Sequence, residues 1–368
     1  MNRKKILSIF IIGLTLICSS TAIAAQTTAD NSLDIEKVAI KAIDNSIPVK
    51  TYERNTDNAN KLYNYTVAGA QKAIYYGKAS VQAIIIAPWE AKNNFNQFVI
   101  NKGVVKNAVR INAYSSYINL LKANYAVNIQ QQLADSMYKE NQKAQSQLAN
   151  GQISRSDARL AQINYEKAVL DLNKYKNSFD SASMAVNLAM GEDINKRYTT
   201  LVDKNIVPSN KLRTLDNYVK GALQNRAEIV NDQNTVDTKK KELEYTQYER
   251  YSDYEFYLQQ IQTDIDNSQN TLDEDKIKVQ LDINNGYKLL ETNKKTMESK
   301  QAACDLAQSN YEAGKVQYDN GMITLKQYQD IQIALAKAQM DLKNAQLDTW
   351  LQQTMMSYAS DVGYVAKK

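Results

Sequence analysis

The feature that most constrains the fold is an internal duplication of the sequence. The pair Asn150-Gly151 recurs as Asn320-Gly321, 170 positions later, and the residues around the two pairs align at the same spacing. The aligned pairs include Tyr117 with Tyr287, Ile153 with Ile323, Ser154 with Thr324, Gln162 with Gln332, and Asp171 with Asp341. A repeat of this length predicts two structurally equivalent units, which we place at residues 25–195 and 196–368.

Long helices are the predicted building blocks of both units. Proline occurs only at positions 48, 88 and 208, so long stretches contain no residue that forbids a helix. Apolar residues recur in alternating steps of three and four, which is the seven-residue period of a coiled-coil seam. In the first unit this seam follows Ala161, Tyr165, Ala168, Leu172, Tyr175, Phe179, Ala182 and Val186, and in the second Tyr328, Ile331, Leu335, Ala338, Leu342 and Ala345. Many seam positions are alanine, so the helices bury little apolar area per turn and are expected to need several neighbours.

Each Asn-Gly pair is predicted to end one helix and reverse the chain. Glycine readily adopts the positive φ of a helix C-terminus. Ser154 and Thr324 follow at the spacing of N-caps for the returning helices. The helices that enter the turns are predicted to begin near Val104 and Ile277, which makes them roughly 65–70 Å long. The predicted fold class is therefore mainly α, with long antiparallel coiled-coil hairpins.

The N-terminus is predicted to be a secretory signal peptide over residues 1–24. Arg3, Lys4 and Lys5 precede an apolar stretch, and Ala22-Ile23-Ala24 offers a cleavage site between small residues. The chain has 45 basic and 40 acidic residues, and three of the basic ones lie in this segment. The exported part is nearly neutral and has no basic stripe, so nucleic acid is not an expected partner.

The composition argues against an enzyme. Histidine is absent, which removes the commonest general base and the commonest metal ligand. Cys304 is the only thiol outside the predicted signal peptide, so neither a disulfide nor a paired-cysteine metal site is expected. The sequence shows no glycine-rich phosphate loop and no nucleophile elbow. We expect no catalytic residues, no metal and no cofactor.

The residues around the turns resemble a known family. Residues 148–168 read LANGQISRSDARLAQINYEKA, residues 318–338 read YDNGMITLKQYQDIQIALAKA, and residues 222–229 read ALQNRAEI. Together with the duplication and the export signal, these segments resemble the TolC-type outer membrane efflux protein family over roughly Leu33 to Gly363.

The resemblance implies an architecture and partners. Members assemble as homotrimers whose long helices close into a hollow cylinder across the periplasm, and a short β-barrel continues the channel in the outer membrane. Their glycine turns meet a periplasmic adaptor (membrane fusion) protein that is docked to an inner-membrane pump. The expected localisation is therefore the outer membrane or the cell envelope.

The resemblance also assigns expected site residues. The adaptor-facing turns match Gly151, Gln152, Ile153, Ser154, Gly321, Met322, Ile323 and Thr324. A tunnel constriction in the family matches Gln327 and Asp330, where only one of the two residues is an acid, and Tyr318 matches a position that latches the closed tip. Each has a structural alternative, because Asp330 fits a solvated helix face and Tyr318 fits seam packing.

The membrane end departs from the family pattern. Residues Ala79–Pro88 and Asn94–Lys106 could supply one strand pair in the first unit, whereas residues 247–274 show helical spacing and many acids. A short β-hairpin in the first unit therefore belongs to the expected fold. Two functions stay open. The first is a channel or duct component of an efflux or secretion system, and the second is a barrel-less TolC-like structural or adaptor coiled coil of the cell envelope.

Overall fold

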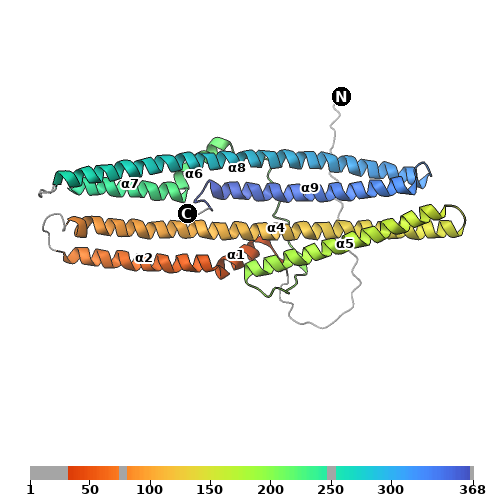
Figure 1. Cartoon of the computed structure of the whole chain (residues 1–368), viewed down its shortest axis with the longest axis horizontal. Helices are drawn as coiled ribbons and strands as arrows, with labels where there is room; N and C mark the ends of the chain where they lie inside the picture. The colour runs from red at the N-terminus through yellow and green to blue at the C-terminus, as the bar shows by residue number, and fades with distance from the viewer. Residues whose placement is uncertain (1–31, 74–80, 247–253, 365–368) are drawn as a thin grey trace, which may run out of the picture. The chain divides into compact units, whose positions relative to one another are not determined.

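The computed structural model describes residues 32–73, 81–246 and 254–364. The predicted signal peptide lies outside these residues. The first half holds β1 (Ser32–Leu33), α1 (Ile35–Asn45), α2 (Ile47–Lys72), the π-helical segment η1 (Gln82–Ile86), α4 (Ala87–Ala149) and α5 (Arg155–Met190). The second half holds β2 (Thr200–Leu201), α6 (Leu215–Asn225), α7 (Ala227–Thr246), α8 (Tyr254–Asp319) and α9 (Leu325–Ala359). The expected fold class, mainly α with long hairpins, is confirmed (Figure 1).

The two halves repeat one order of elements. In each, two shorter helices precede one very long helix, a glycine turn and a returning helix. The long helices α4 and α8 contain 63 and 66 residues. At 1.5 Å per residue each is roughly 95–100 Å long, which exceeds the predicted length because both helices begin earlier than expected. The boundary proposed between residues 195 and 196 stays a prediction.

The strand pair expected in the first half is wrong for the described residues. Residue 81 is helical, Gln82–Ile86 is π-helical, and residues 94–106 lie inside α4. The isoleucines at 84–86 favour a strand locally, but η1 packs against α2 and α7, and Ile86 is fully buried there. Pro88 lies in the first turn of α4, directly after the π-helical segment.

The helices pack mainly as hairpins. α4 lies along α5 and α2, and α8 lies along α9 and α7 (Figure 1). The two halves meet where α4 contacts α9 and α7. In the region of the two glycine-turn hairpins, α4 and α9 lie at the centre. The helices α5 and α8 lie on the outside.

The largest apolar cluster joins the two halves near the middle of α4. It combines α1 and α4 with the end of α5 and Leu347 of α9, and it includes the fully buried Tyr117, Leu121 and Val186. The Tyr117 hydroxyl lies 2.6 Å from the Leu33 carbonyl and 2.9 Å from the Val202 carbonyl, and it shares its single proton between these two acceptors. These bonds hold the parallel β1–β2 pair against α4.

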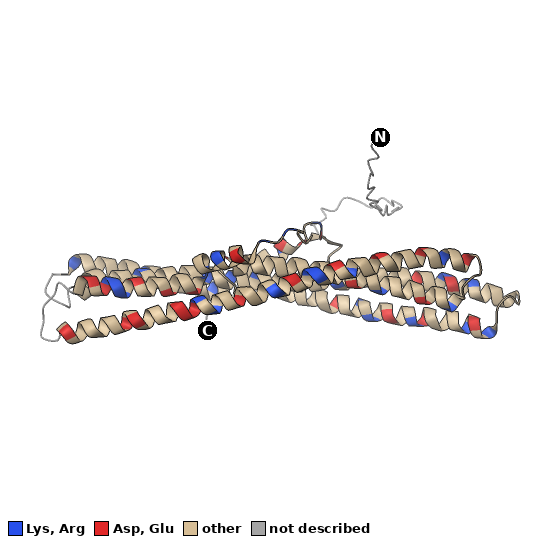
Figure 2. Cartoon of the chain, turned by 90° about the horizontal axis from the view of Figure 1, so that it is seen from above, with Lys and Arg blue, Asp and Glu red and all other residues tan. Residues whose placement is uncertain are grey.

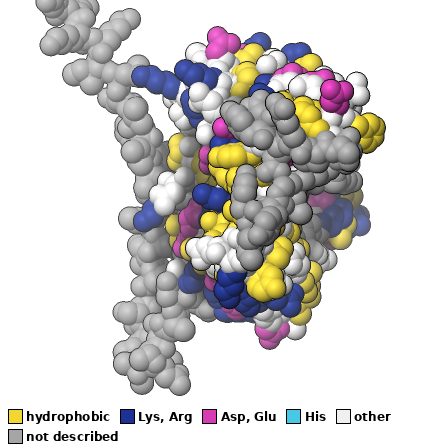
Figure 3. Space-filling view, turned by 90° about the vertical axis from the view of Figure 1, so that its left-hand side faces the viewer, with side chains coloured by type: hydrophobic (Ala, Val, Ile, Leu, Met, Phe, Trp, Pro, Cys, Tyr) yellow, Lys and Arg dark blue, Asp and Glu magenta, His cyan; other side chains and the backbone are white. Residues whose placement is uncertain are grey.

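The surface carries both basic and acidic residues, and neither kind is concentrated in one region. Figure 2 shows basic and acidic residues interspersed along the helices rather than gathered into a stripe. Tyr65, Trp89 and Phe256 are exposed near the ends of α2, α4 and α8 that lie farthest from the turns. Figure 3 faces this end of the molecule, where apolar and charged side chains are mixed. Among the described residues, no helix combines the length and apolarity that crossing a bilayer requires.

Candidate docking site at the two helix reversals

The two glycine turns have the same backbone geometry. Gly151 and Gly321 adopt φ values of 70° and 74°. Their N–H groups donate to Leu148 and Tyr318 carbonyls at 3.0 Å in both cases. The next residue in each turn donates back to a glutamine carbonyl at 2.8 Å, which completes a Schellman motif. The positive φ, rather than lack of space, requires glycine, since a Cβ at either position would meet nothing within 4 Å.

Both returning helices begin with a side-chain cap, as predicted. The Ser154 hydroxyl accepts a hydrogen bond from the Asp157 N–H at 3.1 Å. The Thr324 hydroxyl accepts from the Gln327 N–H at 3.3 Å, and the Gln327 side chain accepts from the Thr324 N–H at 2.8 Å. The second turn therefore carries a complete capping box. These caps fix the direction in which α5 and α9 leave the turns.

The two turns converge on one cavity of about 710 Å³. Its apolar lining comes from both turns and includes Ile153, Leu160, Ile323 and Leu325. Its charged lining carries both signs and includes Lys143, Asp157, Asp319 and Lys326. Side chains from positions 170 residues apart thus form one surface, which the tertiary packing of α4 against α9 creates. Among the described residues, no cluster of acidic or thiol side chains could hold a metal ion.

Tyr318 connects the two hairpins beside this cavity. Its hydroxyl on α8 donates a hydrogen bond of 3.0 Å to Glu140 Oε2 on α4. Its ring stacks on Tyr328 at a centroid distance of 4.7 Å, and the Lys143 ammonium lies 4.4 Å from its centroid. Burial and the neighbouring Glu140 carboxylate raise the pKa of Tyr318. The residue therefore makes a hairpin-to-hairpin bond and also packs in the seam, and its role as a latch of the closed tip stays a prediction.

The two residues expected at a tunnel constriction stay on the exposed face of α9. Asp330 pairs with Lys326 at 2.7 Å, and both side chains are well exposed. Such a pair contributes little to stability. Gln327 is held in the capping box. Neither residue lines the cavity between the turns, and a constriction formed by several copies stays a prediction.

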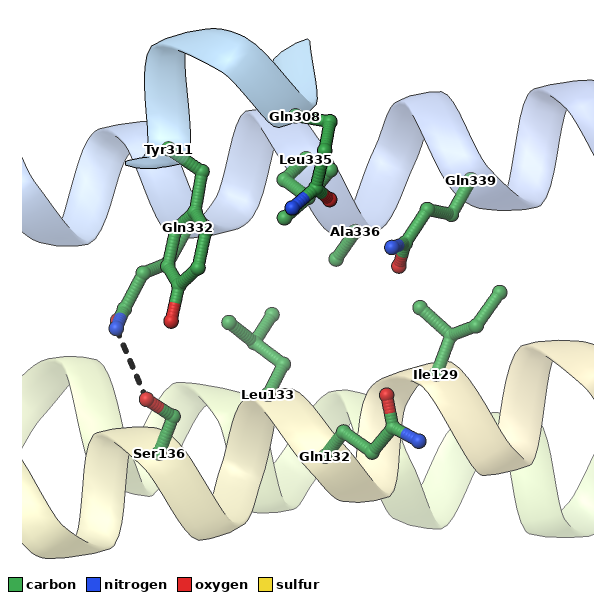
Figure 4. Close-up of a pocket in the computed structure, with 10 residues that line it drawn as sticks. All are labelled: Ile129, Gln132, Leu133, Ser136, Gln308, Tyr311, Gln332, Leu335, Ala336 and Gln339. Carbon is green, nitrogen blue, oxygen red and sulfur yellow. Dashed lines mark hydrogen bonds between the residues drawn. The ribbon is translucent and has the colours of Figure 1, made fainter. Parts of the chain in front are cut away.

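A buried polar seam between the hairpins was not anticipated. Gln332 Nε2 donates to Ser136 Oγ at 2.9 Å across a cavity of about 260 Å³, which glutamines from three helices line (Figure 4). Nearer the turns, Asn164 donates to Gln329 at 2.5 Å. Gln329 Nε2 and Gln332 Oε1 are buried without a partner among the described residues. Buried polar atoms of this kind usually bind ordered water.

The outer helices also carry exposed apolar side chains. On α8, Ile277, Leu281 and Leu306 are 67%, 59% and 63% exposed. They point away from the buried face of the same helix, which includes Val279, Ile283 and Leu290. On α5, Ile163, Leu170 and Leu188 are exposed in the same way. Both outer helices are thus apolar on two faces, of which one is covered in the single chain.

Comparison with known proteins identifies the fold. No family model and no curated protein sequence matches the chain. Solved structures do match. The CmeC outer membrane channel of Campylobacter jejuni is 12% identical with a TM-score of 0.66, covering 90% of this chain and 87% of that one. The outer membrane protein VceC of Vibrio cholerae is 10% identical with a TM-score of 0.67, covering 90% and 97%. The MtrE outer membrane channel of Neisseria gonorrhoeae, in its open state, is 10% identical with a TM-score of 0.64, covering 90% and 89%.

These similarities extend over nearly the whole chain, at identities that sequence comparison does not detect. The described chain therefore has the TolC-type fold, and the resemblance inferred from the turn segments is confirmed at the level of the fold.

Proposed function

We propose that this chain is the duct component of an envelope efflux or secretion system, which assembles as a homotrimer and docks an adaptor-type protein through its glycine turns. The observation that carries the proposal is the convergence of both turns on one cavity. The structurally similar proteins CmeC and MtrE are outer membrane channels, which supports an outer membrane or envelope location for an exported chain of the same fold.

The chemistry of the cavity between the turns suits a helical partner. Ile153, Ile323 and Leu325 offer an apolar floor, which the apolar face of an amphipathic helix would cover. Lys143 and Asp319 on its lining provide one charge of each sign, so a partner helix with both signs on its flanks would pair with them. An adaptor whose α-helical hairpin ends at these turns has this chemistry. An inner-membrane pump is proposed as a further partner because the resemblance to the TolC-type family implies one.

The uncovered apolar faces of α5 and α8 support lateral assembly. A long solvated helix should be apolar on one side only, whereas Leu281 and Leu306 lie exposed on the side of α8 that faces away from α9. Closed rings form when one surface of each copy contacts a different surface of the next. Packing of α8 of one copy against α5 of the next would cover both apolar faces and close a ring of three.

A first experiment tests the oligomer. Sedimentation analysis of the purified protein should show trimers. The pair of substitutions Leu281→Lys and Leu306→Lys should yield monomers, because each places a charge in the contact between copies. The pair Asn58→Lys and Asn60→Lys on the exposed surface of α2, which adds the same charge away from α5 and α8, serves as the control. Monomers of the unsubstituted protein under all solvent conditions would contradict the proposed duct.

A second experiment tests docking. A photo-crosslinking amino acid at position 153 or 323 should capture a different envelope protein in the source cell. One at position 188 should capture only another copy of this chain, because Leu188 lies at the far end of α5, on the face proposed for contact between copies. Ile323→Asp should remove the adduct captured from position 153, and Ile153→Asp should remove the adduct captured from position 323, while the helix content stays unchanged. Equal adducts from all three positions would contradict docking at the turns.

A second candidate function is a structural or adaptor coiled coil of the cell envelope that conducts no solute. The observation in its favour is that residues 81–106 are helical where a strand pair was expected. Solute flux through proteoliposomes containing the purified protein separates the two candidates. The duct predicts flux that depends on the protein, whereas the coiled coil predicts none. Neither candidate is an enzyme, in keeping with the absence of histidine.

A further inference from the structure

Asn-Gly pairs are chemically special because the following glycine has no side chain to hinder its backbone nitrogen. The described residues contain three such pairs: Asn150-Gly151, Asn285-Gly286 and Asn320-Gly321. We propose that Asn150 is a preferred site of spontaneous deamidation, and that the fold protects the other two pairs to different degrees. The result is a modification that accumulates faster in the first glycine turn than in its duplicate.

The reaction needs only water. The Gly151 backbone nitrogen attacks the Asn150 side-chain carbonyl carbon, Cγ, and a five-membered succinimide ring forms. The bond from Cγ to Nδ2 breaks, and the amide nitrogen leaves as ammonia with the proton from the Gly151 nitrogen. Water then opens the ring at either carbonyl. The products are aspartate or isoaspartate, and both carry a carboxylate where the amide stood.

The two turns form a matched pair for this reaction because their backbones are alike. Both asparagines are exposed and end their helices, with φ and ψ of −87° and 3° at Asn150. The glycine N–H donates to the carbonyl two residues before the asparagine at 3.0 Å in both turns. The attacking nitrogen is therefore restrained equally at the two sites, and the backbone alone would give the same rate.

The side chains differ. Asn320 Nδ2 donates a hydrogen bond of 2.9 Å to the Val316 carbonyl, one turn back along α8. Within residues 32–73, 81–246 and 254–364, the Asn150 side chain makes no hydrogen bond, so its carboxamide is free to rotate toward the glycine nitrogen. For Asn320 to reach the same geometry, its hydrogen bond must break first. The first turn is therefore the more reactive one.

The third pair is protected by its position. Asn285 and Gly286 lie in the middle of α8, with about thirty helical residues on each side. Ring closure there would require the helix to open locally. Gly286 also packs closely against α9, since a Cβ at this position would lie 2.7 Å from the Met356 sulfur. Openings inside a packed helix are far rarer than motions at an exposed helix end.

The modification would alter the proposed docking surface. A carboxylate at position 150 would add a negative charge between Gln147 and Ile153, which line the cavity between the turns. Isoaspartate would also lengthen the backbone by one carbon inside the Schellman motif. Only this consequence rests on the proposed docking function. The modification itself follows from the turn geometry alone.

The test is peptide mapping by mass spectrometry of the purified full chain, aged at mildly alkaline pH and physiological temperature. The same chain unfolded in urea gives the intrinsic rate of each pair, which corrects for the different residues before each asparagine. After this correction, Asn150 should convert about two- to fivefold faster than Asn320, the range that one exposed hydrogen bond can impose. Asn285 should convert more than about tenfold slower than Asn150.

Two results would overturn the proposal. One is a corrected rate at Asn320 equal to or above that at Asn150, and the other is conversion of Asn285 as fast as either turn. The Asn150→Gln variant supplies the control, because glutamine would need a larger ring. It should abolish conversion at position 150 and leave the rate at Asn320 unchanged. Since the readout is mass rather than docking, a failure of the docking hypothesis would leave this result intact.

Discussion

Tyr318 on α8 donates a 3.0 Å hydrogen bond to Glu140 on α4, and this bond joins the two hairpins. The two bonded residues lie 178 positions apart in the sequence. The contact lies beside the cavity that both glycine turns line. The two hairpins are therefore bonded directly to each other at the end of the molecule where we propose docking.

The substitution Tyr318→Phe should loosen this end of the fold. It removes the hydrogen bond to Glu140 and keeps the ring stacked on Tyr328. The free energy of unfolding should fall by about 1 kcal/mol, and hydrogen exchange should increase in the last turns of α8. Tyr65→Phe on α2 is the control, because Tyr65 is exposed and far from this contact. An unchanged exchange rate near residue 318 would show that the bond does not hold the hairpins together.

The glycines of the turns should resist substitution. Gly151→Ala and Gly321→Ala each force a Cβ into positive φ, and each should lower the free energy of unfolding by about 1–2 kcal/mol. Gly69→Ala in α2 is a matched control with open space around it, and it should stabilise the protein by about 0.5–1 kcal/mol. Urea denaturation monitored by circular dichroism measures all three. The same sign of change at positions 69 and 151 would refute the conformational argument.

Loss of the Tyr117 hydroxyl should weaken the link between the two halves. Tyr117→Phe leaves the apolar packing intact and removes hydrogen bonds to the carbonyls of Leu33 and Val202. The Leu33 carbonyl keeps one partner, the Val202 N–H at 2.9 Å. We expect a loss of about 1 kcal/mol in the free energy of unfolding, since the half-buried Val202 carbonyl loses this partner. If calorimetry finds Tyr117→Phe as stable as the original protein, the β1–β2 pair does not depend on this hydroxyl.

The stability should decrease at high pH because of buried tyrosines. Burial raises the pKa of Tyr117 and of Tyr318 above the ordinary value of about 10. A pKa that is raised in the folded state gives stability that is fully present below the unfolded pKa and is lost as the pH rises toward the folded value. The melting temperature should therefore be constant up to about pH 9 and then fall. The decrease should be smaller in Tyr117→Phe. An equal decrease in that variant would mean that other groups cause the transition.

Local chemistry explains which parts of the fold could be predicted. The two chain reversals depend on residues only a few positions apart, namely a glycine with positive φ and an N-cap three residues later. The coiled-coil seam likewise repeats every seven residues, so Ala161, Ala168 and Leu172 were expected to be buried and are. Such features can be seen in a short window of sequence.

Features that depend on distant partners were missed. The burial of Gln329 and Gln332 could not be foreseen, because a glutamine on a helix is usually solvated, and Ser136, the partner of Gln332, lies 196 positions away. The three isoleucines at 84–86 favoured a strand, but packing of η1 between α2 and α7 made the segment helical. The duplication aligns Gln162 of the first half with Gln332 of the second half, yet only Gln332 is buried.

The sequence by itself determined the duplicated hairpins and their Asn-Gly reversals, because helix periodicity and capping are interactions between near neighbours. Only the tertiary structure decided that both reversals line one cavity, that Tyr318 bonds to Glu140, and that Asn320 but not Asn150 is restrained. The duplication makes the two turns equal in sequence pattern. Packing makes them unequal, because each copy of the repeat meets different neighbours.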